Sequence, residues 1–137
     1  MARLLSIDYG KKRTGIAVSD PLQLIANGLT TVETAGLFDF LADYLQKEEV
    51  SCIVVGLPKQ MNNEPSENMK RIEPFVNRLR KCYPDIPVVF YDERFTSVMA
   101  QQTMRDAGLK KKARQNKALA DEISATIILQ TYMESRK

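Results

Sequence analysis

The chain has 137 residues, of which 44% are apolar and 27% are charged, and its formal net charge is +3. This length predicts a single domain over residues 1–137, and this composition is typical of a soluble globular protein. No apolar run approaches the roughly 20 residues of a membrane span, and the N-terminus lacks the pattern of a signal peptide. We therefore expect a cytoplasmic protein with no membrane partner.

The chain contains no histidine. This excludes Ser-His-Asp and Cys-His catalysis, a histidine general base and histidine-ligated zinc. Hydrolytic chemistry would have to use carboxylates, lysines or a hard metal ion held by oxygen ligands. Cys52 and Cys82 lack metal-ligand spacing and are expected to be reduced thiols.

The N-terminal region predicts an antiparallel hairpin. Apolar-rich runs at 3–7 and 16–19 stop at Asp8 and Asp20, respectively. The connecting loop is expected to contain two glycines, Gly10 and Gly15. Because Asp is depleted inside strands, an Asp directly after a buried strand is either a turn former or a ligand.

A third strand is predicted at 29–33, after a turn at Asn27-Gly28. Apolar residues at helical spacing then predict a helix over 37–45, with Thr34 as its N-cap. The unbroken apolar run at 52–55 is typical of a parallel strand covered on both faces. The N-terminal half thus predicts a three-stranded meander, a helix and a buried strand.

The second half alternates helices and strands. A loop is predicted at 59–65, a helix at 69–79 with a kink at Pro74, a strand at 88–91, a helix from Thr96 to about Ala107 and a last helix at about 116–134. The second helix has a basic face, formed by Arg71, Arg78, Arg80 and Lys81. Right-handed crossovers would place the fourth and fifth strands parallel to the first, with their C-terminal ends at one edge. The fold class is therefore α/β, a five-stranded mixed sheet flanked by helices.

Three carboxylates are candidates for a metal site. Asp8 follows the first strand and Glu93 follows the fifth, so this topology brings both to one edge of the sheet. Asp121 shares a face of the last helix with apolar residues, and a buried acid needs a partner. That partner is either Lys117, one turn earlier, or a bound metal ion. Clustered acids without histidine favour Mg²⁺ or Mn²⁺, as two ions that activate water and stabilise the leaving oxygen of a phosphodiester.

Basic residues gather before the last helix and at the predicted hairpin tip. The run near 110–117 is either a solvated loop or a clamp for phosphates, and it consists of Lys110, Lys111, Lys112, Arg114 and Lys117. Lys12 and Arg13 either contact phosphate or form a solvated tip. Arg94 either binds phosphate or braces Asp8 and Glu93.

Four ordered motifs carry a resemblance to a known family. They are the D-x-G-x-K-R-x-G-x-A pattern from Asp8 to Ala17, Gly56-Leu57-Pro58, Asp92-Glu93-Arg94-Phe95-Thr96, and the closing helix pattern from Lys117 to Ile128. Together they resemble the YqgF (RuvX) family of Holliday-junction resolvases and ribosomal RNA precursor nucleases. The resemblance implies a ribonuclease H-like fold and makes Asp8, Glu93 and Asp121 the catalytic acids. Asn62-Asn63 departs from the family, which often has Asp and Gly there.

These observations predict a metal-dependent nuclease acting on structured nucleic acid. The resemblance favours processing of the ribosomal RNA precursor (pre-16S rRNA), with cleavage of branched DNA at Holliday junctions as the alternative. A non-catalytic nucleic-acid binder with the same fold is a second class. An actin-like ATPase or kinase is a third, although that class normally needs two such lobes around the nucleotide. The oligomeric state, monomer or homodimer, is left open.

Overall fold

The computed structural model describes residues 2–57, 69–92 and 117–135. The strands in these ranges are β1 (Arg3–Asp8), β2 (Arg13–Ser19), β3 (Ala26–Glu33), β4 (Val50–Leu57) and β5 (Val88–Asp92). The helices are η1 (Thr34–Gly36, a 3-10 turn), α1 (Leu37–Lys47), α2 (Met69–Cys82) and α5 (Lys117–Ser135). The loop predicted at 59–65, the helix predicted from Thr96 and the basic run before Lys117 lie outside the described residues.

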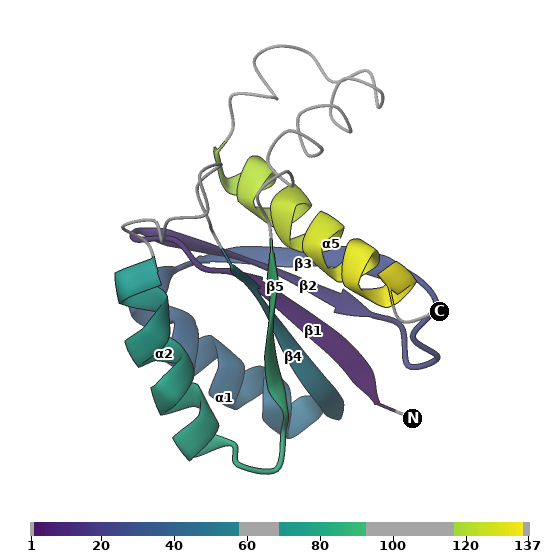
Figure 1. Ribbon diagram of the computed structural model, residues 1–137, viewed down its shortest axis with the longest axis horizontal. Helices are drawn as coiled ribbons and strands as arrows, with labels where there is room; N and C mark the ends of the chain where they lie inside the picture. Colours follow the sequence, from purple (N-terminus) through teal and green to yellow (C-terminus); the bar gives the residue numbers. More distant parts are fainter. Residues whose placement is uncertain (1, 58–68, 93–116, 136–137) are drawn as a thin grey trace.

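The strands form one mixed sheet in the order β3-β2-β1-β4-β5 (Figure 1). β2 pairs antiparallel with both β1 and β3. β4 pairs parallel with both β1 and β5. The prediction of three antiparallel strands followed by two parallel strands is therefore confirmed. Because β1, β4 and β5 run in the same direction, their C-terminal ends lie at one edge of the sheet, which we call the C-terminal edge.

Helices cover both faces of the sheet, with α1 and α2 on one face and α5 on the other (Figure 1). The side chains of β1 alternate between these faces, because Leu5 and Ile7 pack in the α1/α2 core whereas Leu4 packs in the α5 core. The α5 core is completed by Ala17, Cys52, Val54, Ala125, Ile128, Leu129 and Met133. β1 is thus covered on both faces, which explains its apolar run.

The turn between β2 and β3 differs from the prediction. Asn27 and Gly28 lie within β3 and do not form a turn. The chain turns instead at 20–25, where the Asp20 carboxylate accepts the backbone N–H groups of Leu22, Leu24 and Ile25. A side chain that satisfies three backbone donors stabilises this longer turn.

Gly28 has a different role from the one predicted. The register of β2 and β3 shifts between Ile16 and Ala17, whose partners are Thr30 and Gly28, so that one residue of β3 bulges out. A Cβ atom on Gly28 would lie 2.5 Å from Oε1 of Glu122 in α5. The glycine therefore leaves room for the Glu122 side chain of α5 against the sheet.

Two further local predictions are wrong. Gly15 lies in β2 rather than in the hairpin loop, because β2 begins at Arg13. Thr34 does not cap α1, whose N-cap is Gly36 without a side-chain hydrogen bond. The Thr34 hydroxyl instead donates to the Gly10 carbonyl at 2.7 Å. A long-range contact has replaced the local cap.

The remaining helices lie where they are predicted. α2 contains Pro74 within its length, and the last predicted helix is α5. The kink at Pro74 stays a prediction. Both cysteines are thiols, Cys52 buried and Cys82 exposed. Among the helices in the described ranges, none combines the length and the apolar character that crossing a membrane requires.

Candidate active site at the C-terminal edge of the sheet

Asp8 is the last residue of β1, at the C-terminal edge. It pairs with Gly15 of β2, and it follows Ile7, which pairs with Val55 of β4. Leu4 and Ser6 of β1 face α5. Because every second residue of a strand points to the same face of the sheet, Asp8 also lies on the α5 face. The residue is half-buried. Asp8 is therefore placed at the rim of the sheet and not inside the core.

The ends of the three parallel strands are nearly level. Val55 of β4 pairs with Ile7 of β1 on one side and with Phe90 of β5 on the other. Counting forward from this row, β5 ends at Asp92 only one residue beyond the level of Asp8. Glu93 follows directly in the sequence, outside the described residues. β5, the strand that precedes Glu93 in the sequence, therefore ends at the same edge of the sheet as Asp8.

α5 runs antiparallel to β1. Near its C-terminal end, Oε1 of Gln130 accepts the backbone N–H of Ala26 at the start of β3. Nearer its N-terminal end, Glu122 lies against Gly28, further along β3. Since β3 and β1 both pair antiparallel with β2, the N-terminal end of α5 points to the C-terminal edge, as Figure 1 shows. Asp121 is in this end of the helix.

A buried serine connects β1 to α5. The Ser6 hydroxyl donates to the backbone carbonyl of Ala125 at 2.6 Å, and Ser6 is fully buried. Asp8 lies two residues beyond Ser6 along the strand, and Asp121 lies one helical turn before Ala125. This hydrogen bond therefore fixes the position of α5, which carries Asp121, against β1, which carries Asp8. Sequence analysis missed Ser6, although a polar residue inside the apolar run at 3–7 was a usable signal.

The loop after Asp8 is held in place by Thr34. The Thr34 hydroxyl binds the Gly10 carbonyl and lies 2.9 Å from the Thr14 hydroxyl, and its backbone N–H donates to the Lys12 carbonyl at 2.9 Å. A Cβ on Gly10 would collide with the carbonyl oxygen of Arg13. The tip of the hairpin is thus a tight, braced turn.

The predicted site residues differ in how the structure describes them. Of the acids, Asp8 is described with its side chain, Asp121 is placed through the backbone of α5, and Glu93 lies outside the described residues. Lys12 is exposed at the hairpin tip, and Arg13 is half-buried opposite Glu33. Lys117 is the first residue of α5, and the other predicted basic residues lie outside the described ranges, namely Arg94, Lys110, Lys111, Lys112 and Arg114. Among the described side chains, no three acidic or cysteine residues are close enough to share a metal ion.

The fold is that of the ribonuclease H-like resolvases. A fowlpox virus resolvase, solved with Holliday junction DNA, superposes with a TM-score of 0.60 at 12% identity, and the match covers 98% of each chain. T. thermophilus RuvC, solved in complex with a Holliday junction substrate, gives a TM-score of 0.59 at 16% identity, and the match covers 99% of this chain and 96% of that one. At these identities the likeness establishes the shared fold.

Sequence comparison identifies the family. The family model described as "RuvX: Holliday junction resolvase" matches residues 2–135. A protein of Phocaeicola vulgatus named "Putative pre-16S rRNA nuclease" is 70% identical over 137 residues, which cover 100% of this chain and 99% of that protein. The chain belongs to the RuvX family, and the resemblance found in the four sequence motifs is confirmed.

Proposed function

We propose that this protein is a metal-dependent nuclease whose catalytic centre lies at the C-terminal edge of the sheet, with Asp8, Glu93 and Asp121 as its acids. The convergence of β1, β5 and the N-terminal end of α5 at this edge is the observation that carries the proposal. Three acids brought together from distant parts of the chain would repel one another without a cation between them.

The donor set fits Mg²⁺ or Mn²⁺. Carboxylate oxygens are the ligands these hard ions prefer, and the absence of histidine from the sequence leaves no competing imidazole ligand. Two such ions, when bound, supply an activated water and stabilise the leaving oxygen of a phosphodiester. In this proposal the three acids hold the ions, and the Ser6 hydrogen bond to Ala125 keeps two of the acids in register.

The substrate we propose is the precursor of 16S ribosomal RNA. The support is the name of a relative that is 70% identical over the whole chain. Cleavage of Holliday junctions is the second candidate, supported by the description of the family model and by two resolvases of the same fold. We further propose that residues 1–137 form one domain that works in the cytoplasm as a monomer or homodimer.

The basic residues would hold the phosphates that flank the scissile bond. Lys12 is exposed at the hairpin tip, immediately after the edge where Asp8 lies. Lys117 begins the helix that carries Asp121. We assign the same role to Arg13, Arg94, Lys110, Lys111, Lys112 and Arg114. Phosphate contacts of this kind set affinity and orientation without reading the sequence.

Cleavage assays with one matched control pair test the proposal. A precursor rRNA fragment and a four-way DNA junction are each incubated with the protein, with and without Mg²⁺. Asp8→Asn should abolish cleavage, because it removes a ligand charge at the rim and keeps the side-chain volume. Asp20→Asn changes the acid that follows β2 at the opposite end of the sheet, and it should cut like the wild type.

A second measurement is independent of activity. Mg²⁺ or Mn²⁺ should raise the melting temperature of the wild type, since ions that bind only the folded state stabilise it. The rise should be smaller in Asp8→Asn and unchanged in Asp20→Asn. Equal metal-dependent shifts in all three proteins would show that Asp8 is not a ligand, and metal-dependent cutting by Asp8→Asn would refute its catalytic role.

A further inference from the structure

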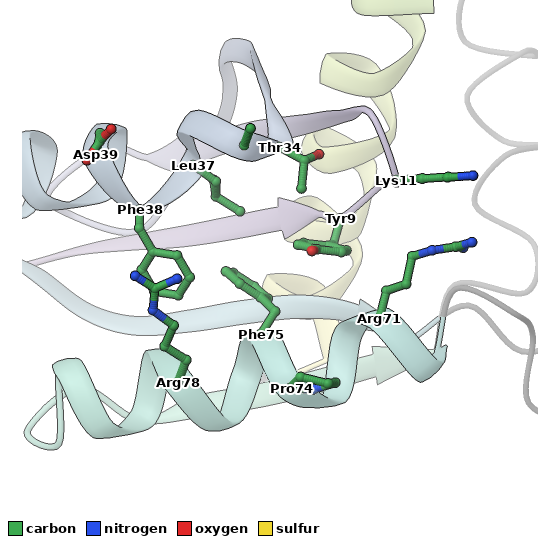
Figure 2. A pocket seen from close by; sticks show the side chains of 11 residues that line it. Tyr9, Lys11, Thr34, Leu37, Phe38, Asp39, Arg71, Pro74, Phe75 and Arg78 are labelled. Atoms are coloured by element: carbon green, nitrogen blue, oxygen red, sulfur yellow. The ribbon is translucent and has the colours of Figure 1, made fainter.

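A groove with a cavity volume of about 550 Å³ opens on the α1/α2 face, beside the hairpin tip (Figure 2). Its walls include Tyr9 and Lys11 from the segment after β1, Phe38 from α1, and Arg71, Phe75 and Arg78 from α2. Tyr9 directly follows Asp8 and packs against the α1/α2 core, on the face of the sheet opposite to Asp8. The groove and the proposed catalytic acids therefore lie on either side of the same strand end.

The groove is positively charged. Lys11, Arg71 and Arg78 line it, against one carboxylate, Asp39 of α1. Figure 2 shows Lys11 and Arg71 extending in the same direction, past the end of β1, while Asp39 lies away from them. Within the described part of the chain, no carboxylate forms an ion pair with Lys11, Arg71 or Arg78. A groove with this charge attracts anions.

The floor of the groove is aromatic and preorganised. The Tyr9 and Phe75 rings stack with their centroids 4.7 Å apart, and the Phe38 ring meets Phe75 edge-on at 5.4 Å. The guanidinium of Arg78 lies over the Phe38 ring, 4.0 Å from its centroid. Phe75 is buried at 6% exposure and holds the other two rings in place. A flat ligand can therefore stack on the half-buried Tyr9 and Phe38 rings and on the exposed Arg78 guanidinium at little entropic cost.

We propose that this groove binds a single-stranded stretch of the nucleic acid that adjoins the cleaved bond, an inference that rests on the proposed nuclease function. Lys11 and Arg71 bind phosphates of this strand, and its bases lie against the aromatic floor and the Arg78 guanidinium. A basic groove with aromatic platforms is the arrangement by which proteins bind single strands. The substrate therefore passes from the α5 face around the hairpin tip to the α1/α2 face.

A duplex fits the groove less well than a single strand. Its bases are stacked inside the helix, so it would offer only phosphates to Lys11 and Arg71 and would leave the aromatic floor uncovered. Both RNA and DNA single strands have the required phosphates and bases. The assignment is therefore to unpaired nucleic acid, and the sugar is an outcome of the experiment.

Binding is measured by fluorescence anisotropy in the Asp8→Asn background, which prevents cutting. Three labelled probes share one sequence: a blunt duplex, the same duplex with a single-stranded RNA extension, and the same duplex with a DNA extension. Lys11→Ala and Arg71→Ala are compared with Lys81→Ala, which removes an exposed charge from the last turn of the same helix, away from the groove. Each affinity is measured over a series of salt concentrations.

Each groove variant should weaken binding of the extended probes by about tenfold or more, as expected for one lost charge-assisted hydrogen bond. The slope of log affinity against log salt should fall by roughly 0.7 for each lost contact with a single strand. Binding of the blunt duplex should weaken less, because a duplex offers these cations phosphates but cannot stack on the aromatic floor, and Lys81→Ala should bind all three probes like its parent. Equal losses with the blunt duplex, or no loss with the extended probes, would overturn the inference.

The outcome also separates this inference from the proposed function. If the wild type cleaves with Mg²⁺ while the groove variants bind extended probes like their parent, only the groove assignment fails. If the extended probes bind through Lys11 and Arg71 but the wild type cuts nothing, the groove assignment holds and the nuclease proposal fails. If the wild type neither binds nor cuts, both fail.

Discussion

The hydrogen bond between Ser6 and Ala125 offers a direct test of how the fold positions the proposed acids. Ser6→Val removes the hydroxyl and adds methyl groups where β1 meets the backbone of α5. Ser6 is fully buried, and the small residues Ala17 and Ala125 in the same core show how closely the helix approaches the sheet. The extra volume should push the N-terminal end of α5, which carries Asp121, away from Asp8.

The expected loss of stability follows from two effects. Losing a buried hydrogen bond costs roughly 0.5 to 1.5 kcal/mol, and overpacking a close helix contact costs roughly 1 to 3 kcal/mol. Ser6→Val should therefore lower the free energy of unfolding by about 1.5 to 4.5 kcal/mol. Ser6→Ala loses only the hydrogen bond and should cost about 1 kcal/mol, because the Ala125 carbonyl also accepts a helical N–H.

Cleavage should respond more strongly than stability does. A displacement of about 1 Å between catalytic groups can reduce a rate on the order of 100-fold. Urea denaturation gives the stability of each variant, and the Mg²⁺-dependent cleavage rate is measured below the unfolding transition. Ser6→Val should cut at least about tenfold more slowly than the wild type while it is fully folded, because even a displacement smaller than 1 Å separates the catalytic groups.

Ser19 provides the matched control. It is also fully buried, and its hydroxyl accepts the Leu4 N–H at 2.8 Å and donates to the Asp20 carbonyl at 2.9 Å, at the opposite end of the sheet. Ser19→Ala should lower the free energy of unfolding by about 1 to 3 kcal/mol without slowing cleavage by the folded protein. If Ser6→Val and Ser19→Ala cut equally fast when folded, the proposed role of Ser6 in positioning α5 is refuted.

Three further predictions concern the hairpin tip, the Asp20 turn and the basic run. Gly10→Ala should lower stability by roughly 1 to 3 kcal/mol in urea denaturation, because the new Cβ meets the Arg13 carbonyl oxygen, and an unchanged midpoint would contradict this packing. The backbone N–H of Ile25, aided by those of its neighbours, lowers the pKa of Asp20 below 3.8, so this stabilisation should be complete above pH 3.8 and disappear as the pH falls through the lowered pKa. Asp20→Asn should flatten the pH dependence of stability in that range, and an identical acid unfolding curve would argue against these bonds. Changing the lysines at 110–112 together to Ala should weaken binding of many sequences alike and reduce the salt slope by roughly 0.7 to 0.9 for each lost phosphate contact, whereas a loss confined to one sequence would show base reading.

The sequence by itself determined the order of strands and helices and the mixed topology. The apolar runs at 3–7, 52–55 and 88–91 identify strands, and the unbroken run at 52–55 also predicts a strand covered on both faces. The right-handed crossover rule then places their ends at one edge, and the register of β1, β4 and β5 confirms this. The position of Asp8 at that edge followed from the sequence for the same reason.

Tertiary structure alone decided where turns fall and which small residues matter. Asn27-Gly28 is a strong local turn signal, but the Asp20 carboxylate satisfies three backbone donors and the Glu122 side chain occupies the space that a Cβ on Gly28 would fill. Thr34 has the local properties of an N-cap, yet its hydroxyl binds a carbonyl 24 residues away. Local propensities amount to about 1 kcal/mol, and a long-range contact of similar strength can override them.

The basic groove likewise depends on tertiary structure, although part of its charge is visible in the sequence. Arg71 and Arg78 belong to the basic helix face that the sequence predicts, whereas Lys11 was not singled out in the sequence, and nothing there showed that these residues share one cavity. Arg71 and Lys11 are brought together only because α2 packs on the face opposite to Asp8, with Phe75 against Tyr9. Residues 60 positions apart meet through burial of apolar surface, which depends on the whole sheet and cannot be read from either segment alone.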